Sequence, residues 1–416
     1  METGSPQSEL FCPETTDLIA GTSEFKAENA RLAEAEYEAT RTHVRHMPPW
    51  INLTGTTVCN LKCYMCNQAY DDLPRWTMGE SVYRKVVQEL YPYVQTVQFS
   101  AFGEPLMTPG LYRKFDDLEN TNTKLEIITN ATLMHDEKLR NRLLDVLEMI
   151  TFSMDGATKE TYDAVRVGAD FDRVLANIEA FCQRRLELPE EKRPRLQFNS
   201  ILMERTIREA GEFVELAHRL GADQVVFNHV VVFHPDLERE SLQFNRELAN
   251  RHIAEARKLG EELGVSVVLP PEFNLNEPQP ERRVPDPSPT NGEASCAETT
   301  PKAPEENGEG ALENPRDVFA ETEVPSGPGR MPRFKCMFLW KRAYIGPHGQ
   351  VVPCCVAGAP SVGNMMDQPF REIWNNETYQ KMRERVFTPH PYGPCKNCYL
   401  IYTSPDEADR EAFLKF

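Results

Sequence analysis

The chain has 416 residues, of which 40% are hydrophobic and 26% are charged, as in an ordinary globular protein with room for two or three domains. Its formal net charge of −18, with no basic stripe, argues against nucleic acid and anionic membranes as partners. Neither a secretion signal nor an apolar run of about 20 residues is visible, so we expect a cytoplasmic protein.

Residues 1–49 form an N-terminal extension that is expected to be helical over 24–46. From residue 50, predicted strands and helices alternate, which is typical of βα units around a parallel sheet. Six such units over 50–270 predict an α/β fold of the partial (β/α)6, TIM-like barrel type, with a doubly wound sheet as the alternative. Strands are expected at 50–57, 94–99, 125–129, 149–154, 196–202 and 224–227, and helices at 78–90, 109–118, 136–147, within 159–184, at 207–220 and at 245–263.

Two further segments follow the predicted barrel. Residues 271–332 are rich in Pro and Glu and contain few large apolar side chains, so burial cannot offset their ordering entropy. We interpret them as a flexible linker. Residues 333–416 are rich in cysteine and aromatic residues and are expected to form a small separate domain.

The cysteines point to metal or redox chemistry, because disulfides are rare in the cytoplasm. Cys59, Cys63 and Cys66 follow the first predicted strand with C-x3-C-x2-C spacing, which is one ligand short of a four-iron cluster. Three thiolates leave one iron open to a small chelating molecule. A structural zinc site is the alternative, but no fourth Cys or His follows nearby.

A second group of cysteines lies in the C-terminal segment. Four thiols fit either a zinc ribbon or a fully ligated iron–sulfur cluster, and ligand chemistry alone does not separate these. The group is Cys336, Cys354, Cys395 and Cys398. We expect Cys12, Cys182 and Cys296 to take no part in either site.

Over residues 50–270 the sequence resembles the radical S-adenosylmethionine (SAM) superfamily. The resemblance rests on the cysteine triad and on Gly103-Glu104-Pro105 after the second predicted strand. It implies that Cys59, Cys63 and Cys66 hold a [4Fe-4S] cluster whose open iron binds SAM. Reductive cleavage of SAM would then yield a 5′-deoxyadenosyl radical that abstracts a hydrogen atom from a substrate carbon.

The same resemblance implies contacts to SAM at several strand ends. Gly103 and Glu104 match a Gly-Gly-Glu-Pro stretch that binds the SAM amino group, with Phe102 in place of the first glycine. Ser153 and Asn199 would lie near the ribose or carboxylate. Met65 occupies a position near the adenine that is often aromatic in the family.

Residues 334–399 resemble the SPASM/twitch extension of radical SAM enzymes. A full SPASM domain carries two auxiliary clusters, whereas the four cysteines Cys336, Cys354, Cys395 and Cys398 imply one auxiliary [4Fe-4S] cluster. Cys354 follows Pro353, as in the family, and is expected to be the ligand in preference to Cys355. This departure most resembles a twitch-type dehydrogenase that oxidises an aminocyclitol alcohol.

The resemblance therefore implies two-electron oxidation of a sugar, aminocyclitol or similar small molecule in natural-product biosynthesis. The alternatives are an epimerase, in which Cys355 donates a hydrogen atom, and a maturase of a ribosomal peptide. A non-catalytic iron–sulfur carrier or zinc scaffold would gain nothing from a vacant iron. A flavodoxin- or ferredoxin-like protein is expected as electron donor. Asn228 and His229 are candidates to line the substrate pocket, and the general base remains unassigned.

Overall fold

A single sheet with the strand order β10-β9-β8-β1-β2-β3-β4-β5-β6-β7 forms the centre of the protein. The computed structural model describes residue 11 and residues 17–71, 73–99, 102–278, 335–354, 359–393 and 395. Four cysteines lie outside the described residues: Cys12, Cys296, Cys355 and Cys398. Residues 279–334, which include most of the predicted linker, also lie outside them.

The strands from β1 to β7 lie in the order of the sequence, and each pairs in parallel with the next. Because this order does not reverse within these strands, they contain no topological switch point of a doubly wound sheet. The predicted partial barrel is confirmed, with β7 as an additional strand. These strands are β1 Trp50–Leu53, β2 Thr96–Phe99, β3 Lys124–Thr129, β4 Leu147–Ser153, β5 Arg195–Leu202, β6 Gln224–His229 and β7 Ser266–Val268.

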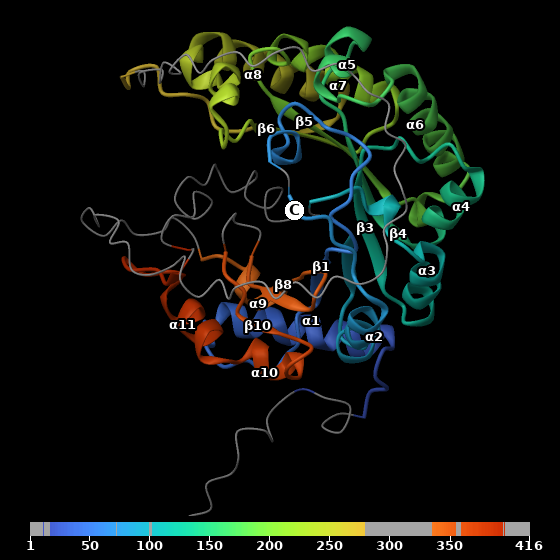
Figure 1. Cartoon of the computed structure of the whole chain (residues 1–416), viewed down its shortest axis with the longest axis vertical. Helices are drawn as coiled ribbons and strands as arrows, with labels where there is room; N and C mark the ends of the chain where they lie inside the picture. The colour runs from blue at the N-terminus through green and yellow to red at the C-terminus, as the bar shows by residue number, and fades with distance from the viewer. Residues whose placement is uncertain are drawn as a thin grey trace, which may run out of the picture.

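Helices cover the outer face of the curved sheet (Figure 1). Several begin at polar N-caps: the side chain of Asp136 accepts a hydrogen bond from Lys138 N, and that of Asp170 accepts one from Arg173 N. None of the described helices is both long and apolar enough to cross a bilayer. The barrel helices are α2 Glu80–Glu89, α3 Leu111–Asn120, α4 Glu137–Val146, α5 Lys159–Val165, α6 Phe171–Leu186, α7 Ala210–Arg219 and α8 Arg246–Leu263. Short 3-10 helices are η3 Asn67–Ala69, η4 Pro105–Met107, η5 Glu190–Lys192, η6 Ile207–Glu209, η7 Pro235–Glu240 and η8 Leu242–Phe244.

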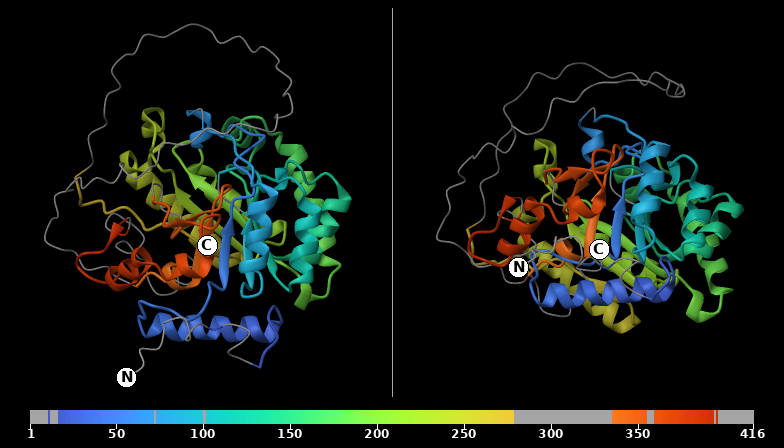
Figure 2. Two further views of the ribbon diagram at one scale, coloured as in Figure 1. Left: turned by 60° about the horizontal axis from the view of Figure 1, so that its bottom comes forward. Right: turned by 90° about the horizontal axis from the view of Figure 1, so that it is seen from below.

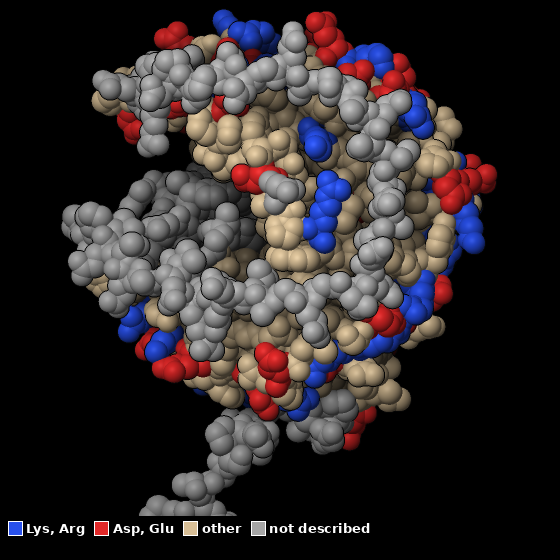
Figure 3. All heavy atoms as spheres, in the orientation of Figure 1, with Lys and Arg blue, Asp and Glu red and all other residues tan. Residues whose placement is uncertain are grey.

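The two faces of the barrel sheet differ in chemistry. Alternate residues such as Ile51, Val97 and Ile127 belong to the hydrophobic core beneath the helices. Their neighbours point to the opposite, inner face, because side chains alternate along a strand. Buried polar residues of this inner face are Asn52, Gln98, Glu126, Thr151, Gln197 and Gln224. On the outside, Figure 3 shows acidic and basic side chains interspersed over the helices.

The C-terminal segment extends the barrel sheet instead of forming a separate one. Its strand β8 pairs in parallel with β1, with Trp50 opposite Arg342 and Leu53 opposite Ile345. This continuity was not predicted from the sequence. The other described elements of the segment are α9 Phe338–Lys341, β8 Arg342–Ile345, β9 Gln350–Val352, β10 Gly363–Asn364, α10 Phe370–Trp374 and α11 Glu377–Arg385.

Residues 23–49, which we call the N-terminal brace, connect the barrel to the C-terminal segment. The brace comprises α1 Ser23–Glu38 and the turn that leads to β1. Figure 2 shows α1 beneath the sheet, and it also contacts α9. The ring of His46 lies between Glu36 Oε2 at 2.7 Å and the carbonyl oxygen of Trp340 at 2.6 Å. The predicted helix over 24–46 is therefore shorter, because residues 39–46 make tertiary contacts instead.

Residues 271–278, the first part of the predicted linker, pack against α8. The side chain of Asn250 donates to Phe273 O and accepts from Phe273 N, both at 2.8 Å. Arg246 Nη1 donates to Asn274 O at 3.0 Å and to Glu277 O at 2.9 Å. Hydrogen bonds thus compensate the low apolar content of this short stretch.

Replacing Glu36 with Gln is expected to destabilise the protein by about 2–3 kcal/mol at pH 7, because Glu36 is a buried partner of charged and backbone donors. Burial alone raises the pKa of Glu36, but hydrogen bonds from His46 and Arg45 outweigh it and lower the pKa to about 2. This stability is present above the ordinary value of 4.5 and is lost as pH falls from 4.5 to about 2.

Urea unfolding across this pH range measures both effects. The matched control Glu261→Gln, at an exposed position of α8, should change the free energy of unfolding by less than about 0.5 kcal/mol. Equal acid sensitivity of Glu36→Gln and the unmodified protein would contradict the assignment.

Candidate functional site

The cysteine triad lies in the loop that follows β1, at the carboxyl end of the barrel. Cys63 is buried, and Cys59 and Cys66 are half-buried. The loop is held against the end of α5, because Lys62 N donates to Val167 O at 3.0 Å and Tyr64 N donates to Val165 O at 2.8 Å. The backbone therefore fixes where the three thiols lie.

Two polar side chains approach the thiols from neighbouring loops. Arg166 Nη1 lies 3.6 Å from Cys63 Sγ, and Asn130 Nδ2 lies 3.9 Å from Cys59 Sγ. Burial raises the pKa of Cys63 to about 11, although the Arg166 guanidinium opposes this rise. Burial also raises the pKa of Cys59. A cationic or metallic partner would favour the thiolate forms.

Arg166 is itself held by Asp155, a residue that follows β4. Arg166 Nη2 lies 2.6 Å from Asp155 Oδ2, and Asp155 Oδ1 accepts a hydrogen bond from Ile201 N at 2.6 Å. The Asp155 carboxylate raises the pKa of Arg166 despite its burial. The sequence showed Asp155 and Arg166 only as parts of a motif, and it carried no sign of the contact between Arg166 and Cys63.

The three thiols suit a cluster better than a single ion. They are near neighbours, since the charge of Cys66 raises the pKa of Cys59, and the charges of both raise that of Cys63. Among the described residues, however, no three His, Cys, Asp or Glu side chains converge tightly enough to hold one metal ion. In a four-iron cluster each thiolate takes its own iron, so such convergence is not required.

Gly103 allows the loop after β2 to approach the cysteine loop. A Cβ atom at this position would lie 2.6 Å from the carbonyl oxygens of both Thr56 and Val58. Next to it, Glu104 N donates to Val58 O at 2.9 Å. Gln68 adds a second connection between the loops through its bonds to Thr57 O and Phe102 O. Only glycine fits this contact.

Glu104 connects the loop after β2 with the loop after β3. Its carboxylate accepts from Thr129 Oγ1 at 2.7 Å, Asn130 N at 2.9 Å and Leu106 N at 3.1 Å. Burial raises the pKa of Glu104, with these hydrogen bonds opposing the rise. Beside it, Ala131 has a φ of 58°, a left-handed conformation that glycine adopts more readily. Glu104 thus has a structural role in addition to its predicted contact with SAM.

The other predicted SAM contacts lie around the same end of the barrel. Ser153 and Asn199 are register partners on β4 and β5, both half-buried, and Asn228 Nδ2 donates to Asn199 Oδ1 at 3.2 Å. Ser200, in contrast, is buried. Met65 is half-buried in the cysteine loop. Three of these residues therefore share one face of the sheet: Ser153, Asn199 and Asn228.

His229 does not share this face with Asn228. Alternation along β6 directs it outward, where its ring lies 4.8 Å from that of Phe273. Burial lowers the pKa of His229 to about 4, so the ring is neutral at pH 7. Of the two candidates for the substrate pocket, the structure places only Asn228 beside the predicted SAM contacts.

The second cysteine group is only partly described. Cys336 precedes α9 and Cys354 follows β9, so both flank the β8–β9 hairpin that extends the barrel sheet. Cys395 is buried, and Cys336 packs against the hydrophobic core. Burial raises the pKa of Tyr379 on α11, and the charge of Cys354 adds to this rise. The fourth predicted ligand, Cys398, lies outside the described residues.

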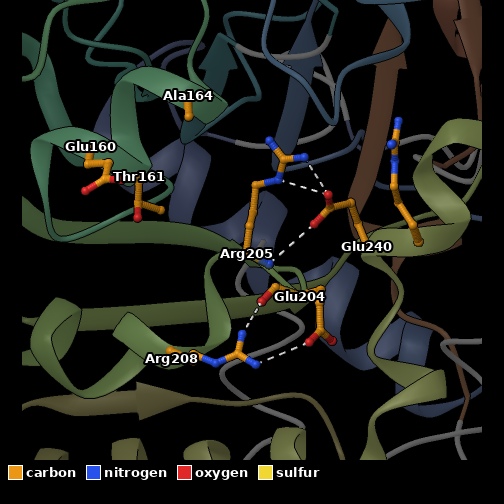
Figure 4. A pocket seen from close by; sticks show the side chains of 8 residues that line it. Glu160, Thr161, Ala164, Glu204, Arg205, Arg208 and Glu240 are labelled. Atoms are coloured by element: carbon orange, nitrogen blue, oxygen red, sulfur yellow. Dashed lines mark hydrogen bonds and ion pairs between the residues drawn. The ribbon is translucent and has the colours of Figure 1, made fainter.

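A charged pocket of about 520 Å³ adjoins the cysteine loop (Figure 4). Two ion pairs lie in its wall: Arg205 is 2.5 Å from Glu240, and Arg208 is 3.4 Å from Glu204. The Arg205 guanidinium also stacks 3.8 Å above the ring of Tyr64. The contact between Arg205 and Tyr64 therefore joins one wall of this pocket to the cysteine loop.

Comparison with known proteins gives two family matches. Residues 53–188 match the Radical SAM superfamily, and residues 336–399 match SPASM, an iron-sulfur cluster-binding domain. The chain is 24% identical over 348 residues to an AdoMet-dependent heme synthase of Methanosarcina barkeri, covering 82% of this chain and 86% of that protein.

Two similar solved structures support the fold. Streptococcus suis SuiB bound to precursor peptide SuiA has a TM-score of 0.52 at 14% identity, covering 88% of this chain and 75% of that one. The anSMEcpe protein with bound AdoMet has a TM-score of 0.52 at 16% identity, covering 80% and 78%. At these identities the likeness shows the fold alone.

Gly103→Ala is expected to destabilise the protein by about 1–3 kcal/mol and to reduce iron incorporation, because the added methyl group forces the two loops apart. Gly79→Ala is the matched control: its Cβ would meet no atom within 4 Å, and its φ is −66°. The control should stay within about 1 kcal/mol. Guanidinium unfolding and iron analysis measure the two effects, and equal behaviour of both variants would refute the close approach.

Proposed function

We propose that this chain, which matches the Radical SAM superfamily and carries a C-terminal SPASM domain, catalyses the two-electron oxidation of a small polar substrate. Its cofactors are SAM, a [4Fe-4S] cluster and an auxiliary iron–sulfur cluster. The observation that carries the proposal is that three thiols gather at the mouth of a barrel whose inner face is polar. Such a surface suits a substrate rich in hydroxyl or amino groups, such as a sugar or an aminocyclitol.

Cys59, Cys63 and Cys66 would hold the cluster whose open iron binds SAM, and Cys336, Cys354, Cys395 and Cys398 would hold the auxiliary cluster. When bound, the first cluster and SAM together supply a 5′-deoxyadenosyl radical for hydrogen abstraction. Arg166 and Asn130 would donate hydrogen bonds to ligand sulfurs, and the Asp155 carboxylate holds Arg166 in place for this role.

The residues proposed to bind SAM come from four places at the carboxyl end of the barrel: the loops after β1 and β2, the end of β4, and β5. Gly103 lets the backbone approach the cysteine loop, and Glu104, whose carboxylate is fixed by hydrogen bonds from Thr129 and Asn130, would bind the amino group of SAM. Met65, Ser153 and Asn199 would contact the adenosine and carboxylate parts. Ser153 and Asn199 are strand partners, and Glu104 is hydrogen-bonded to Val58 and Asn130, so these three are held in place without SAM.

After hydrogen abstraction, the substrate radical must lose one proton to a base and one electron, which the auxiliary cluster would accept; a separate donor must deliver the electron that cleaves SAM. A flavodoxin- or ferredoxin-like protein is proposed as the electron donor. Cys355 would be the hydrogen donor if the reaction were an epimerisation.

Anaerobic reconstitution followed by dithionite and SAM tests the proposal. The unmodified protein should bind about eight irons, as two four-iron clusters, and release 5′-deoxyadenosine. The triple variant Cys59→Ala/Cys63→Ala/Cys66→Ala should lose about half of the iron and all of the deoxyadenosine. Cys182→Ala, a buried cysteine of α6, is the matched control and should retain both. Zinc in place of iron, or deoxyadenosine from the triple variant, would contradict the proposal.

Product analysis in deuterated water separates oxidation from epimerisation. Oxidation gives a product two electrons more oxidised, with no deuterium from solvent at the reacting carbon. Deuterium at that carbon without net oxidation would refute dehydrogenation and would favour epimerisation, in which case Cys355→Ala should abolish deuterium incorporation.

A further inference from the structure

Arg342 is a buried arginine whose terminal nitrogens are unsatisfied. It is the first residue of β8, is 2% exposed, and neither Nη1 nor Nη2 has a hydrogen-bond partner within the described part of the chain. Other buried arginines have more partners. Arg185 donates to Pro194 O and pairs with Asp223, each at 2.7 Å, and Arg383, although its Nη2 also lacks a partner among the described residues, donates to Leu339 O and Thr42 O.

The surroundings of Arg342 explain its position but not its charge. Its guanidinium stacks 3.6 Å above the ring of Trp50 and 5.0 Å from that of Phe338. Stacking on aromatic faces leaves the in-plane N–H groups of a guanidinium free. Because an unpaired buried charge costs several kcal/mol, hydrophobic residues would stabilise this site better.

Arg342 faces the inner surface of the barrel. Its neighbour Ala343 belongs to the hydrophobic core, so alternation directs Arg342 to the opposite face, and its register partner Trp50 lies beside Asn52 on that face. The charge of Arg342 also acts on Glu126, which accepts from Gln98 Nε2 at 3.4 Å. A row of polar side chains thus leads from Arg342 across β1, β2 and β3.

Further atoms on the same face have no partner in the described residues. Thr151 and Gln197 are register partners on β4 and β5, and both Thr151 Oγ1 and Gln197 Nε2 lack hydrogen bonds. Polar groups of this kind are retained in a fold when a ligand or ordered water satisfies them. Their shared face indicates one common ligand region.

We propose that Arg342 binds a carboxylate of the substrate, and that the Asn52–Gln98–Glu126 row binds hydroxyl or amino groups of the same molecule. This inference rests on the proposed function and names its substrate class as a polyhydroxylated or amino-substituted carboxylic acid. The guanidinium fork matches a carboxylate, with one N–H group directed at each oxygen.

Two features support a carboxylate at this position. Burial raises the pKa of Glu126 to about 8, so this side chain is mostly neutral at pH 7 and does not repel an anion. Arg342 also lies at the amino ends of the strands, whereas the cysteine loop lies at the carboxyl ends. Three residue steps along β1, about 10 Å, separate the Arg342–Trp50 pair from the carboxyl end of the strand, so the carboxylate would lie at least that far from the cysteine loop.

Isothermal titration calorimetry of the reconstituted holoenzyme with SAM tests the proposal. The probe is gluconate, with sorbitol as a matched chain that lacks the carboxylate. Gluconate should bind saturably and sorbitol should bind at least about tenfold more weakly. Arg342→Gln should weaken gluconate binding at least about tenfold, and Arg342→Lys, which keeps the charge but not the fork, should fall between.

Arg185→Gln is the matched control for loss of a buried arginine. It should lower the unfolding temperature and leave the gluconate affinity within about twofold, whereas Arg342→Gln should not lower the unfolding temperature. Equal gluconate binding by Arg342→Gln and the unmodified protein, no saturable binding by the unmodified protein, or a thermal loss as large as in Arg185→Gln would overturn the proposal.

The deoxyadenosine assay of the unmodified protein separates this inference from the proposed function. Gluconate binding without SAM cleavage would refute the enzyme activity alone, and SAM cleavage without gluconate binding would refute the role of Arg342 alone.

Discussion

The parallel pairing of β1 with β8 determines how the two parts of the protein relate. The cysteine triad follows β1, and Cys336 and Cys354 flank the hairpin that starts at β8, so one sheet positions the triad and two cysteines of the second group. Register fixes this relation residue by residue, because a slip by one position would turn Arg342 from the inner face to the core. The N-terminal brace reinforces the pairing from below through His46 and Trp340.

The two faces of the barrel sheet have opposite effects on the stability of the fold. The outer face and its helices form a continuous hydrophobic core, which supplies most of the stability. The inner face holds buried amides, hydroxyls and charges, several of which lack partners among the described residues, and these lower stability. Stability is commonly given up where a binding surface needs polar groups, and the location of these groups on one face follows that pattern.

Much of this architecture was predictable from the sequence, because apolar periodicity predicts the strands and helices from β1 to α8. Cysteine spacing picks out the two cysteine groups, whose role as cluster ligands stays a prediction. Other features depend on contacts between distant residues. The three-residue strand β7 and the four-residue strand β8 are too short for a clear pattern, and the placement of β8 against β1 leaves no local signal. The contact between Arg166 and Cys63 joins residues 103 positions apart, so only the structure reveals it. Likewise, only the structure shows that Arg342 is buried without hydrogen-bond partners for Nη1 and Nη2 among the described residues.

The N-terminal brace also constrains how the chain is made. His46 and Trp340 are 294 positions apart, and the side chain of Tyr37 bonds to Lys335 across 298. A ribosome therefore exposes the brace and most of the barrel long before their partners exist. During that interval the edge of β1 that later pairs with β8 has no strand partner, and the ring of Trp50 lacks the Arg342 guanidinium that later stacks on it. Contacts of such long sequence separation form slowly, so we expect the nascent chain to pass through a state in which the unpaired edge of β1 is exposed to aggregation.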